Sequence, residues 1–119
     1  MLVIDDSVVA QRVVRTRLEG AGFRVVTLDS AMDLTQAVAE HRPDVVLMDL
    51  EMPTLDGDKA TVGLLRALSD PPPIVIHTSA SAEERDRRAR ACGAIGALEK
   101  TPDDGKFLRD FEALFAHAR

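Results

Sequence analysis

The sequence predicts an α/β domain in which five parallel strands alternate with five helices. Two observations lead to that prediction: short, continuously apolar runs recur along the chain, and segments with helical periodicity separate them. Continuous rather than alternating apolarity is typical of strands that are covered on both faces. Because parallel strands are joined by right-handed crossovers, helices should cover both faces of one sheet, which makes the fold doubly wound.

The five expected strands are apolar runs of three to six residues. They cover residues 1–4, 23–28, 45–48, 74–76 and 94–98. The middle three are rich in valine and isoleucine, which strands favour.

The first two helices are expected where apolar residues recur with helical spacing. Ser7 can cap a helix over residues 8–19, and the glycines that follow end it. Its apolar stripe consists of Ala10, Val13, Val14, Leu18 and Ala21. A second helix is expected over residues 30–41, and Pro43 prevents its continuation.

The last three helices have equally clear limits. The third is expected over residues 58–68, before a loop with three consecutive prolines. The fourth begins after Ser81, which has capping-box spacing to Glu84, and stops at Gly93. The fifth covers residues 104–118 and carries phenylalanine and leucine at the spacing of a buried face.

Length and composition are those of one globular domain, expected to span residues 1–119. Apolar residues make up 45% and charged residues 29%, so disorder is not expected. A formal net charge of −5 argues against direct nucleic-acid binding. The single cysteine, Cys92, excludes an internal disulfide and is expected to be a small buried side chain.

The sequence also argues against membrane insertion and export. No apolar run approaches the ~20 residues that a membrane span needs. Acidic residues from Asp5 onward interrupt any signal peptide. We therefore expect a cytoplasmic protein without a membrane partner.

Residues able to carry out chemistry follow four of the five expected strands. They are Asp5 and Asp6 after the first strand, Asp49 after the third, Thr78 after the fourth and Lys100 after the fifth. In open parallel sheets, ligands bind beyond the carboxyl ends of the strands. Carboxylates gathered at one edge repel one another, and a hard divalent cation such as Mg2+ relieves that repulsion.

Together these residues supply the parts that phosphoryl transfer requires. A carboxylate can itself be the nucleophile and form an acyl phosphate, so Asp49 is the candidate attacking group. Mg2+, Lys100 and Thr78 would each take a share of the phosphoryl oxygens.

From end to end, the chain resembles a CheY-like receiver domain of the response regulators of bacterial two-component signalling. The matching residues are Leu2-Val3-Ile4-Asp5-Asp6-Ser7, Asp44-Val45-Val46-Leu47-Met48-Asp49-Leu50-Glu51-Met52-Pro53, Asp56-Gly57, Pro73-Ile74-Val75-Ile76-His77-Thr78-Ser79 and Gly93-Ala94 leading to Lys100. Each piece is weak alone, but together, at these intervals, they are highly specific. The resemblance implies a flavodoxin-like (βα)5 three-layer sandwich, with the strands in the order 2-1-3-4-5.

The resemblance also implies a metal site. Asp6 and Asp49 bind Mg2+, or Mn2+, through their carboxylates, and the backbone carbonyl of Glu51 completes the protein ligands. Asp5 acts mainly through metal-bound water.

For the phosphoryl group, the resemblance implies that Asp49 is the phosphoacceptor. Lys100 pairs with Asp49 before transfer and with a phosphoryl oxygen afterwards, and Thr78 moves toward the phosphate and transmits its presence. The donor is a phosphohistidine on a sensor histidine kinase or phosphotransfer protein, or a small acyl phosphate. A downstream output protein or domain is expected to meet the face formed by the fourth helix, fifth strand and fifth helix.

Four positions depart from the family pattern. Ala97 replaces the usual aromatic residue, so an aromatic switch coupled to the strand-end threonine cannot operate. Lys100-Thr101-Pro102 replaces Lys-Pro, and a trans Lys100–Thr101 bond is expected because a cis bond before threonine costs about 2.5–4 kcal/mol. Glu51 adds a fourth carboxylate, which either pairs with the lysine, crowds the attacking water or is solvated in its loop. Ser79 replaces alanine or glycine but is small enough for transfer to survive.

The leading hypothesis is therefore a phosphorylation-operated switch, autocatalytic in transfer and dephosphorylation but not an enzyme with an external substrate. One alternative is a pseudo-receiver, an interaction module of the same fold that phosphorylation does not control. A second is a metal-dependent phosphatase, although no Asp-x-Asp nucleophile motif directly follows an expected strand and there is no glycine-rich nucleotide loop. His77 lies in an apolar strand and is expected to be a hydrogen-bonded packing residue rather than a phosphorelay histidine.

Overall fold

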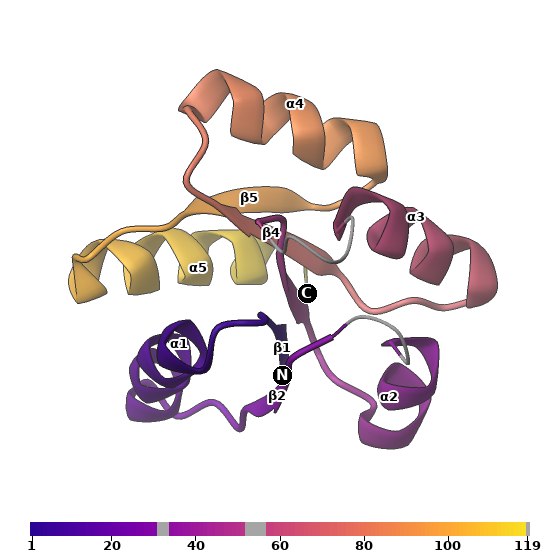
Figure 1. The fold of residues 1–119 in the computed structure, drawn as a ribbon, viewed down its shortest axis with the longest axis horizontal. Helices are drawn as coiled ribbons and strands as arrows, with labels where there is room; N and C mark the ends of the chain where they lie inside the picture. Colours follow the sequence, from indigo (N-terminus) through magenta and orange to yellow (C-terminus); the bar gives the residue numbers. More distant parts are fainter. Residues whose placement is uncertain (31–33, 52–56, 119) are drawn as a thin grey trace.

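The computed structural model describes residues 1–30, 34–51 and 57–118 of the chain. Strands and helices alternate along these ranges (Figure 1). In chain order they are β1 (Leu2–Ile4), α1 (Val8–Gly20), β2 (Val26–Leu28), α2 (Leu34–His41), β3 (Val46–Asp49), α3 (Gly57–Ala67), β4 (Ile74–Thr78), α4 (Ala82–Cys92), β5 (Gly96–Glu99) and α5 (Asp104–Ala118).

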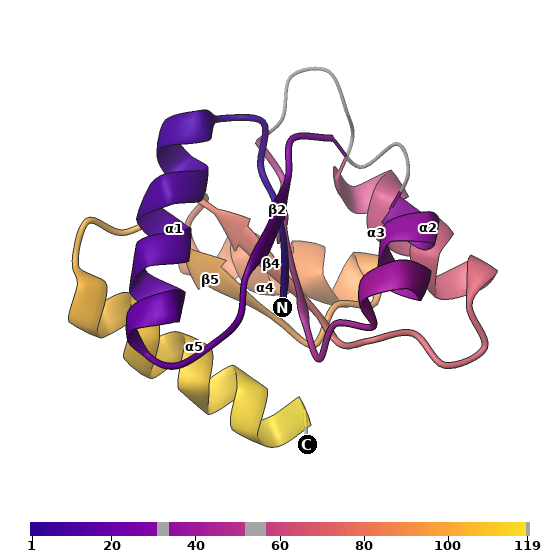
Figure 2. The ribbon, with the colours of Figure 1, turned by 90° about the horizontal axis from the view of Figure 1, so that it is seen from below.

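The strands form one parallel five-stranded sheet in the order β2-β1-β3-β4-β5. Helices α1 and α5 cover one face, and α2, α3 and α4 cover the other (Figures 1 and 2). This arrangement confirms the predicted fold class and strand order. The order reverses between β1 and β3, so the loops that leave these two strands open the crevice in which such sheets bind ligands.

Each face of the sheet carries its own apolar core, because successive strand residues point to opposite sides. Leu2 and Ile4 of β1 pack toward α2, α3 and α4, whereas Val3 packs toward α1 and α5. The second core contains the predicted aromatic stripe of α5, in which Phe107 and Phe111 are fully buried. Burying each such side chain contributes about 1.5–3 kcal/mol. The central strands are thus held from both sides, which fixes the positions of the residues at their carboxyl ends.

Two expectations about the first helix and second strand are wrong in detail. Val13 is 43% exposed, and Arg17 takes a buried place on α1 instead. The Arg17 guanidinium can be buried there because it reaches the Thr101 carbonyl in the β5–α5 loop and the Asp104 carboxylate at the start of α5. Strand β2 begins at Val26 rather than Phe23, whose ring packs edge-on against Phe111 at 5.3 Å.

Other boundaries shift by a few residues. The expected start of the second helix is not seen at Ser30, and residues 31–33 lie outside the described part of the chain. Strand β4 continues through Thr78, so its last residue pairs with β5. Helix α4 ends as predicted, with Gly93 in the left-handed region at φ 87°.

Two further expectations are confirmed. The Lys100–Thr101 peptide bond is trans. Cys92 is buried at 5% exposure in the core beneath α4. Within the described residues, no helix is long and apolar enough to cross a bilayer.

Candidate functional site

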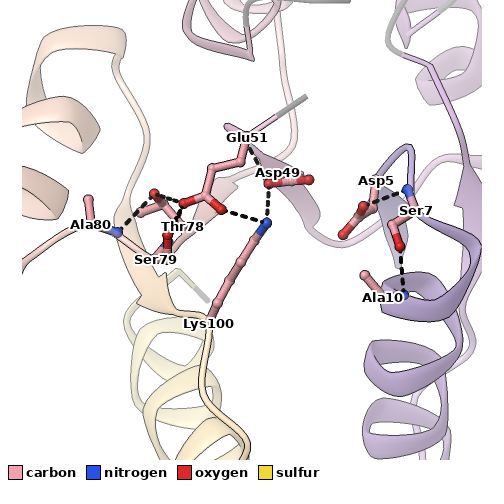
Figure 3. Close-up of polar contacts among 9 residues, drawn as sticks. All are labelled: Asp5, Ser7, Ala10, Asp49, Glu51, Thr78, Ser79, Ala80 and Lys100. Atoms are coloured by element: carbon pink, nitrogen blue, oxygen red, sulfur yellow. Dashed lines mark hydrogen bonds and ion pairs between the residues drawn. The ribbon is translucent and has the colours of Figure 1, made fainter. Parts of the chain in front are cut away.

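The polar residues that follow the strands lie at one edge of the sheet (Figure 3). Asp5 directly follows β1, Asp49 and Thr78 are the last residues of β3 and β4, and Lys100 directly follows β5. The Lys100 backbone N–H donates to the Thr78 carbonyl at 2.9 Å, which extends the β4–β5 pairing into the site. The parallel sheet therefore brings together residues that are up to 95 positions apart in the sequence.

Three aspartates form a cluster at the β1–β3 crevice. One carboxylate oxygen from each of Asp5, Asp6 and Asp49 lies within 4.8 Å of the others. Asp5 and Asp49 are each 2% exposed, whereas Asp6 is exposed. Asp5 is held by the Ser7 backbone N–H, which donates to its Oδ1 at 2.9 Å. The same turn presents the Ser7 hydroxyl to the Ala10 N–H at 3.2 Å and so caps α1.

The second oxygen of Asp5 has no such support. Its Oδ2 is buried and has no hydrogen-bond partner among the residues that the structure describes. Burial raises the pKa of Asp5, and the nearby Asp49 carboxylate raises it further. The Ser7 N–H bond and the Lys100 charge lower the pKa of Asp5, but by less, so it is about 6. An ionised carboxylate in this place is unfavourable unless a cation compensates it.

The aspartate cluster therefore fits a hard divalent cation. Mg2+ takes oxygen ligands and is usually bound by one or two carboxylates together with water and phosphate oxygens. The orphaned Asp5 oxygen, beside two further carboxylate oxygens, is a donor set of that kind. The role of the Glu51 backbone carbonyl as a further ligand stays a prediction.

Lys100 connects the aspartate cluster to the β3–α3 side of the site. Its Nζ lies 2.8 Å from Asp49 Oδ1 and 3.1 Å from Glu51 Oε2. Burial lowers the pKa of Lys100, but the bonds to Asp49 and Glu51 outweigh it, so the pKa is raised and the ammonium stays charged. The Glu51 backbone N–H also donates to Asp49 Oδ1, at 2.9 Å.

The Glu51 side chain is partly exposed, but its carboxylate bonds several neighbours. Besides its pairing with Lys100, which confirms one of the alternatives, its Oε1 accepts from the Thr78 hydroxyl at 3.0 Å and from the Ser79 N–H at 2.6 Å. Burial raises the pKa of Glu51, but the bonds from Ser79, Lys100 and Thr78 outweigh it and hold the pKa at about 2. The contact with Ser79 was missed in the sequence, where only the size of that residue was considered. Its place directly after the strand-end threonine puts Ser79 at the site, but no sequence signal shows that it bonds Glu51.

His77 lies beneath this site, in β4. It is 6% exposed and meets the Phe107 ring edge-on at 5.7 Å, as expected of a packing residue. Its Nε2, however, has no hydrogen-bond partner among the described residues, so the expected hydrogen bond is not found at that atom. Burial, together with the Lys100 charge, lowers the pKa of His77 to about 4. A buried, neutral imidazole has no access to a phosphoryl donor.

Some of the residues that carry the family resemblance lie outside the described part of the chain. These are Met52, Pro53 and Asp56, in the segment that follows Glu51. Gly57, which completes that motif, is the first residue of α3.

Comparison with known proteins gives a consistent result. The family model described as response regulator receiver domain matches residues 1–111. Among curated proteins, the chain is 36% identical over 102 residues to a protein-glutamate methylesterase/protein-glutamine glutaminase of Halobacterium salinarum, covering 83% of this chain and 29% of that protein. It is 34% identical over 119 residues to the transcriptional regulatory protein ZraR of Salmonella typhimurium, covering 100% of this chain and 27% of that protein. The chain thus spans about a third of the length of such relatives.

Solved structures agree with the fold. A two-component response regulator of the LuxR family from Aurantimonas sp. superimposes with a TM-score of 0.83 at 27% identity, covering 99% of this chain and 85% of that one. The chemotaxis protein CheY4 of Vibrio cholerae gives a TM-score of 0.82 over 95% of both chains, and at 24% identity this likeness concerns the fold alone.

Proposed function

Because the chain belongs to the response-regulator receiver family, we propose that it is a phosphorylation-operated switch in which Asp49 accepts a phosphoryl group. The donor is a phosphohistidine of a sensor histidine kinase or phosphotransfer protein. The chain is proposed to form one receiver domain over residues 1–119, to act in the cytoplasm and to turn over no external substrate.

The observation that supports this proposal is the ion pair between Lys100 Nζ and Asp49 Oδ1 at 2.8 Å, beside the aspartate cluster. An Asp49 oxygen attacks the donor phosphorus, and the new O–P bond forms as the P–N bond breaks. The electron pair of that bond stays on the imidazole nitrogen, which takes up a proton. The attacking carboxylate is oriented by Lys100 and by the Glu51 backbone N–H, both of which contact Oδ1.

Charge stabilisation is divided among the neighbouring groups. Bound Mg2+, or Mn2+, would be held by Asp6, Asp49 and the Glu51 carbonyl, with Asp5 acting through water, and would neutralise charge on the phosphoryl oxygens. Lys100 and the Thr78 hydroxyl would take the remaining oxygens. We propose that an output protein or domain reads the result at the α4–β5–α5 face.

The test is covalent labelling. The protein is incubated with acetyl phosphate and Mg2+, and the adduct is located by mass spectrometry of reduced or hydroxamate-trapped peptides. We expect labelling of Asp49, its loss in Asp49→Asn, and its persistence in the control Asp70→Asn, whose carboxylate lies in the loop before β4. A protein that stays folded and is never labelled, by acetyl phosphate or by kinase, would instead be a pseudo-receiver.

A further inference from the structure

The Glu51 carboxylate contacts four groups on three residues, which come from two other strand ends (Figure 3). Its Oε1 accepts from the Thr78 hydroxyl and the Ser79 N–H, and the Ser79 hydroxyl also donates to it, at 2.5 Å. Its Oε2 lies 3.1 Å from Lys100 Nζ. One carboxylate thus engages an ammonium, two hydroxyls and a backbone amide.

These donors include the ones that the proposed function gives to the phosphoryl oxygens. Lys100 and Thr78 were assigned that role, and the Ser79 N–H lies beside the Thr78 hydroxyl because both contact the same Glu51 oxygen. A carboxylate and a phosphoryl group both present anionic oxygens to such donors. The two anions cannot use the same donors at once, and each would repel the other.

We propose that the Glu51 side chain is an internal stand-in for the phosphoryl group, which occupies the phosphoryl-oxygen donors until phosphorylation displaces it. The inference rests on the proposed function, since it concerns the same site. Glu51 already holds Thr78 and Lys100 in the absence of phosphate. Phosphorylation therefore replaces one anion on these donors by another and expels the Glu51 carboxylate.

The surroundings of Glu51 are compatible with this exchange. Its side chain is 36% exposed, so the carboxylate can turn into solvent when its donors are taken. Asp49 is buried and fixed at the end of β3, so the phosphoryl group itself cannot move away. The Glu51 carboxylate, which is on the exposed side chain, is therefore the anion that leaves the shared donors.

Two consequences follow for the switch. Binding of an anion beside Asp49 has to compete with Glu51, which weakens it. In addition, the position of Thr78 changes less on phosphorylation than it would in a site with free donors, because Glu51 already holds its hydroxyl. Expulsion of the Glu51 carboxylate then becomes the larger local change.

The experiment measures the affinity for beryllofluoride, a phosphoryl mimic, in saturating Mg2+. Binding is followed by 1H–15N NMR of the Thr78 and Ser79 amides, because the chain has no tryptophan or tyrosine for intrinsic fluorescence. Glu51→Ala removes the competing carboxylate, and Glu51→Gln keeps its shape without the charge. Glu112→Ala, which removes an exposed carboxylate of α5, is the matched control.

We expect Glu51→Ala to bind beryllofluoride about tenfold more tightly than the unmodified protein, Glu51→Gln to lie between them and Glu112→Ala to be unchanged. The Ser79 amide resonance should move in Glu51→Ala before any anion is added. Equal or weaker binding by Glu51→Ala overturns the inference and leaves the proposed function in place. Absence of binding by every folded variant overturns both. If Glu51→Ala does not fold, Glu51→Gln decides by the same comparison with the unmodified protein.

Discussion

Asp5 Oδ2 is buried without a hydrogen-bond partner in the part of the chain that the structure describes, so we predict that this aspartate destabilises the metal-free protein. The pKa of Asp5 is raised from 3.8 to about 6, mainly by burial, which means that the folded state disfavours the ionised form. Above pH 6 the difference between the two pKa values corresponds to a cost of about 3 kcal/mol. The cost falls as the pH decreases from about 6 and disappears near 4, where the unfolded chain is protonated as well.

The substitution Asp5→Asn removes the charge and keeps an oxygen that can accept from the Ser7 N–H. At pH 7.5 in EDTA, we expect the variant to be more stable than the unmodified protein, by at most about 3 kcal/mol. Mg2+ should narrow this difference, because it stabilises a binding-competent site by about 1.4 kcal/mol at ten times its dissociation constant. Asp5→Asn should lose part of that gain.

Urea denaturation followed by far-UV circular dichroism measures both quantities. Asp70→Asn, in an exposed loop, is the control and should leave stability and its Mg2+ dependence unchanged. His77 complicates the profile of each protein, because its lowered pKa makes stability fall between pH 6.5 and about 4. The difference between the unmodified protein and Asp5→Asn cancels that contribution. A variant that is less stable than the unmodified protein in EDTA would show that the Asp5 charge is compensated within the chain, and the reasoning would fail.

Three other substitutions test the packing around the site. Arg17→Met should lower the free energy of unfolding by about 1–3 kcal/mol, because the buried guanidinium bonds Asp104 and the Thr101 carbonyl and lies over Phe107. The control Arg15→Met, which removes an exposed ion pair, should lower it by less than ~1 kcal/mol. Equal losses for the two variants in urea denaturation would contradict this prediction. Thr61→Val should leave the free energy of unfolding unchanged or raise it by up to about 1 kcal/mol, because the fully buried Thr61 hydroxyl has no partner among the described residues. If thermal denaturation shows that this free energy falls by more than ~1 kcal/mol, the Thr61 hydroxyl makes a hydrogen bond after all. His77→Leu should remove the His77 part of the pH dependence, so lowering the pH from 6.5 to about 4 should destabilise the variant less than the unmodified protein, as measured by the shift of the urea midpoint. The opposite Asp5 contribution is common to both proteins, and an equal shift in both would show that His77 does not contribute.

The fold could be predicted from the sequence because its strands are buried on both faces. Continuous apolar runs such as that of β4 cannot be satisfied at a surface, and they imply helices on both sides of a parallel sheet. Boundaries were predicted less well where tertiary contacts decide them. Phe23 looks like a strand residue by composition, yet its ring is needed against α5, so pairing starts later at Val26. The sequence does not place Arg17 in the interior, since its burial depends on Thr101 in the β5–α5 loop and Asp104 at the start of α5, which are 84 and 87 positions away.

The site could be predicted only as far as backbone position determines it. Each strand ends at a known residue, so Asp49, Thr78 and Lys100 had to meet at one edge of the sheet. The sequence does not determine the direction of the Glu51 side chain, because a loop residue has no periodicity that fixes its orientation. Its contacts with Thr78 and Ser79 depend on rotamers and on competition among charges, which a sequence pattern does not contain. Nor does the sequence show that His77 Nε2 has no hydrogen-bond partner among the described residues.

The charges of the site impose an order on the proposed events. Above the pKa of Asp5, four carboxylates (Asp5, Asp6, Asp49 and Glu51) face one ammonium, that of Lys100, which contacts two of them. A phosphoryl donor approaching this arrangement would meet net negative charge, and its oxygens would find their donors taken. Binding of a divalent cation to the aspartates reduces the repulsion between the site and the donor, and departure of the Glu51 carboxylate frees the groups that bind the phosphoryl oxygens. The two effects act on different residues, Asp5 and Glu51, so the metal dependence and the anion affinity of the site should respond separately to substitution.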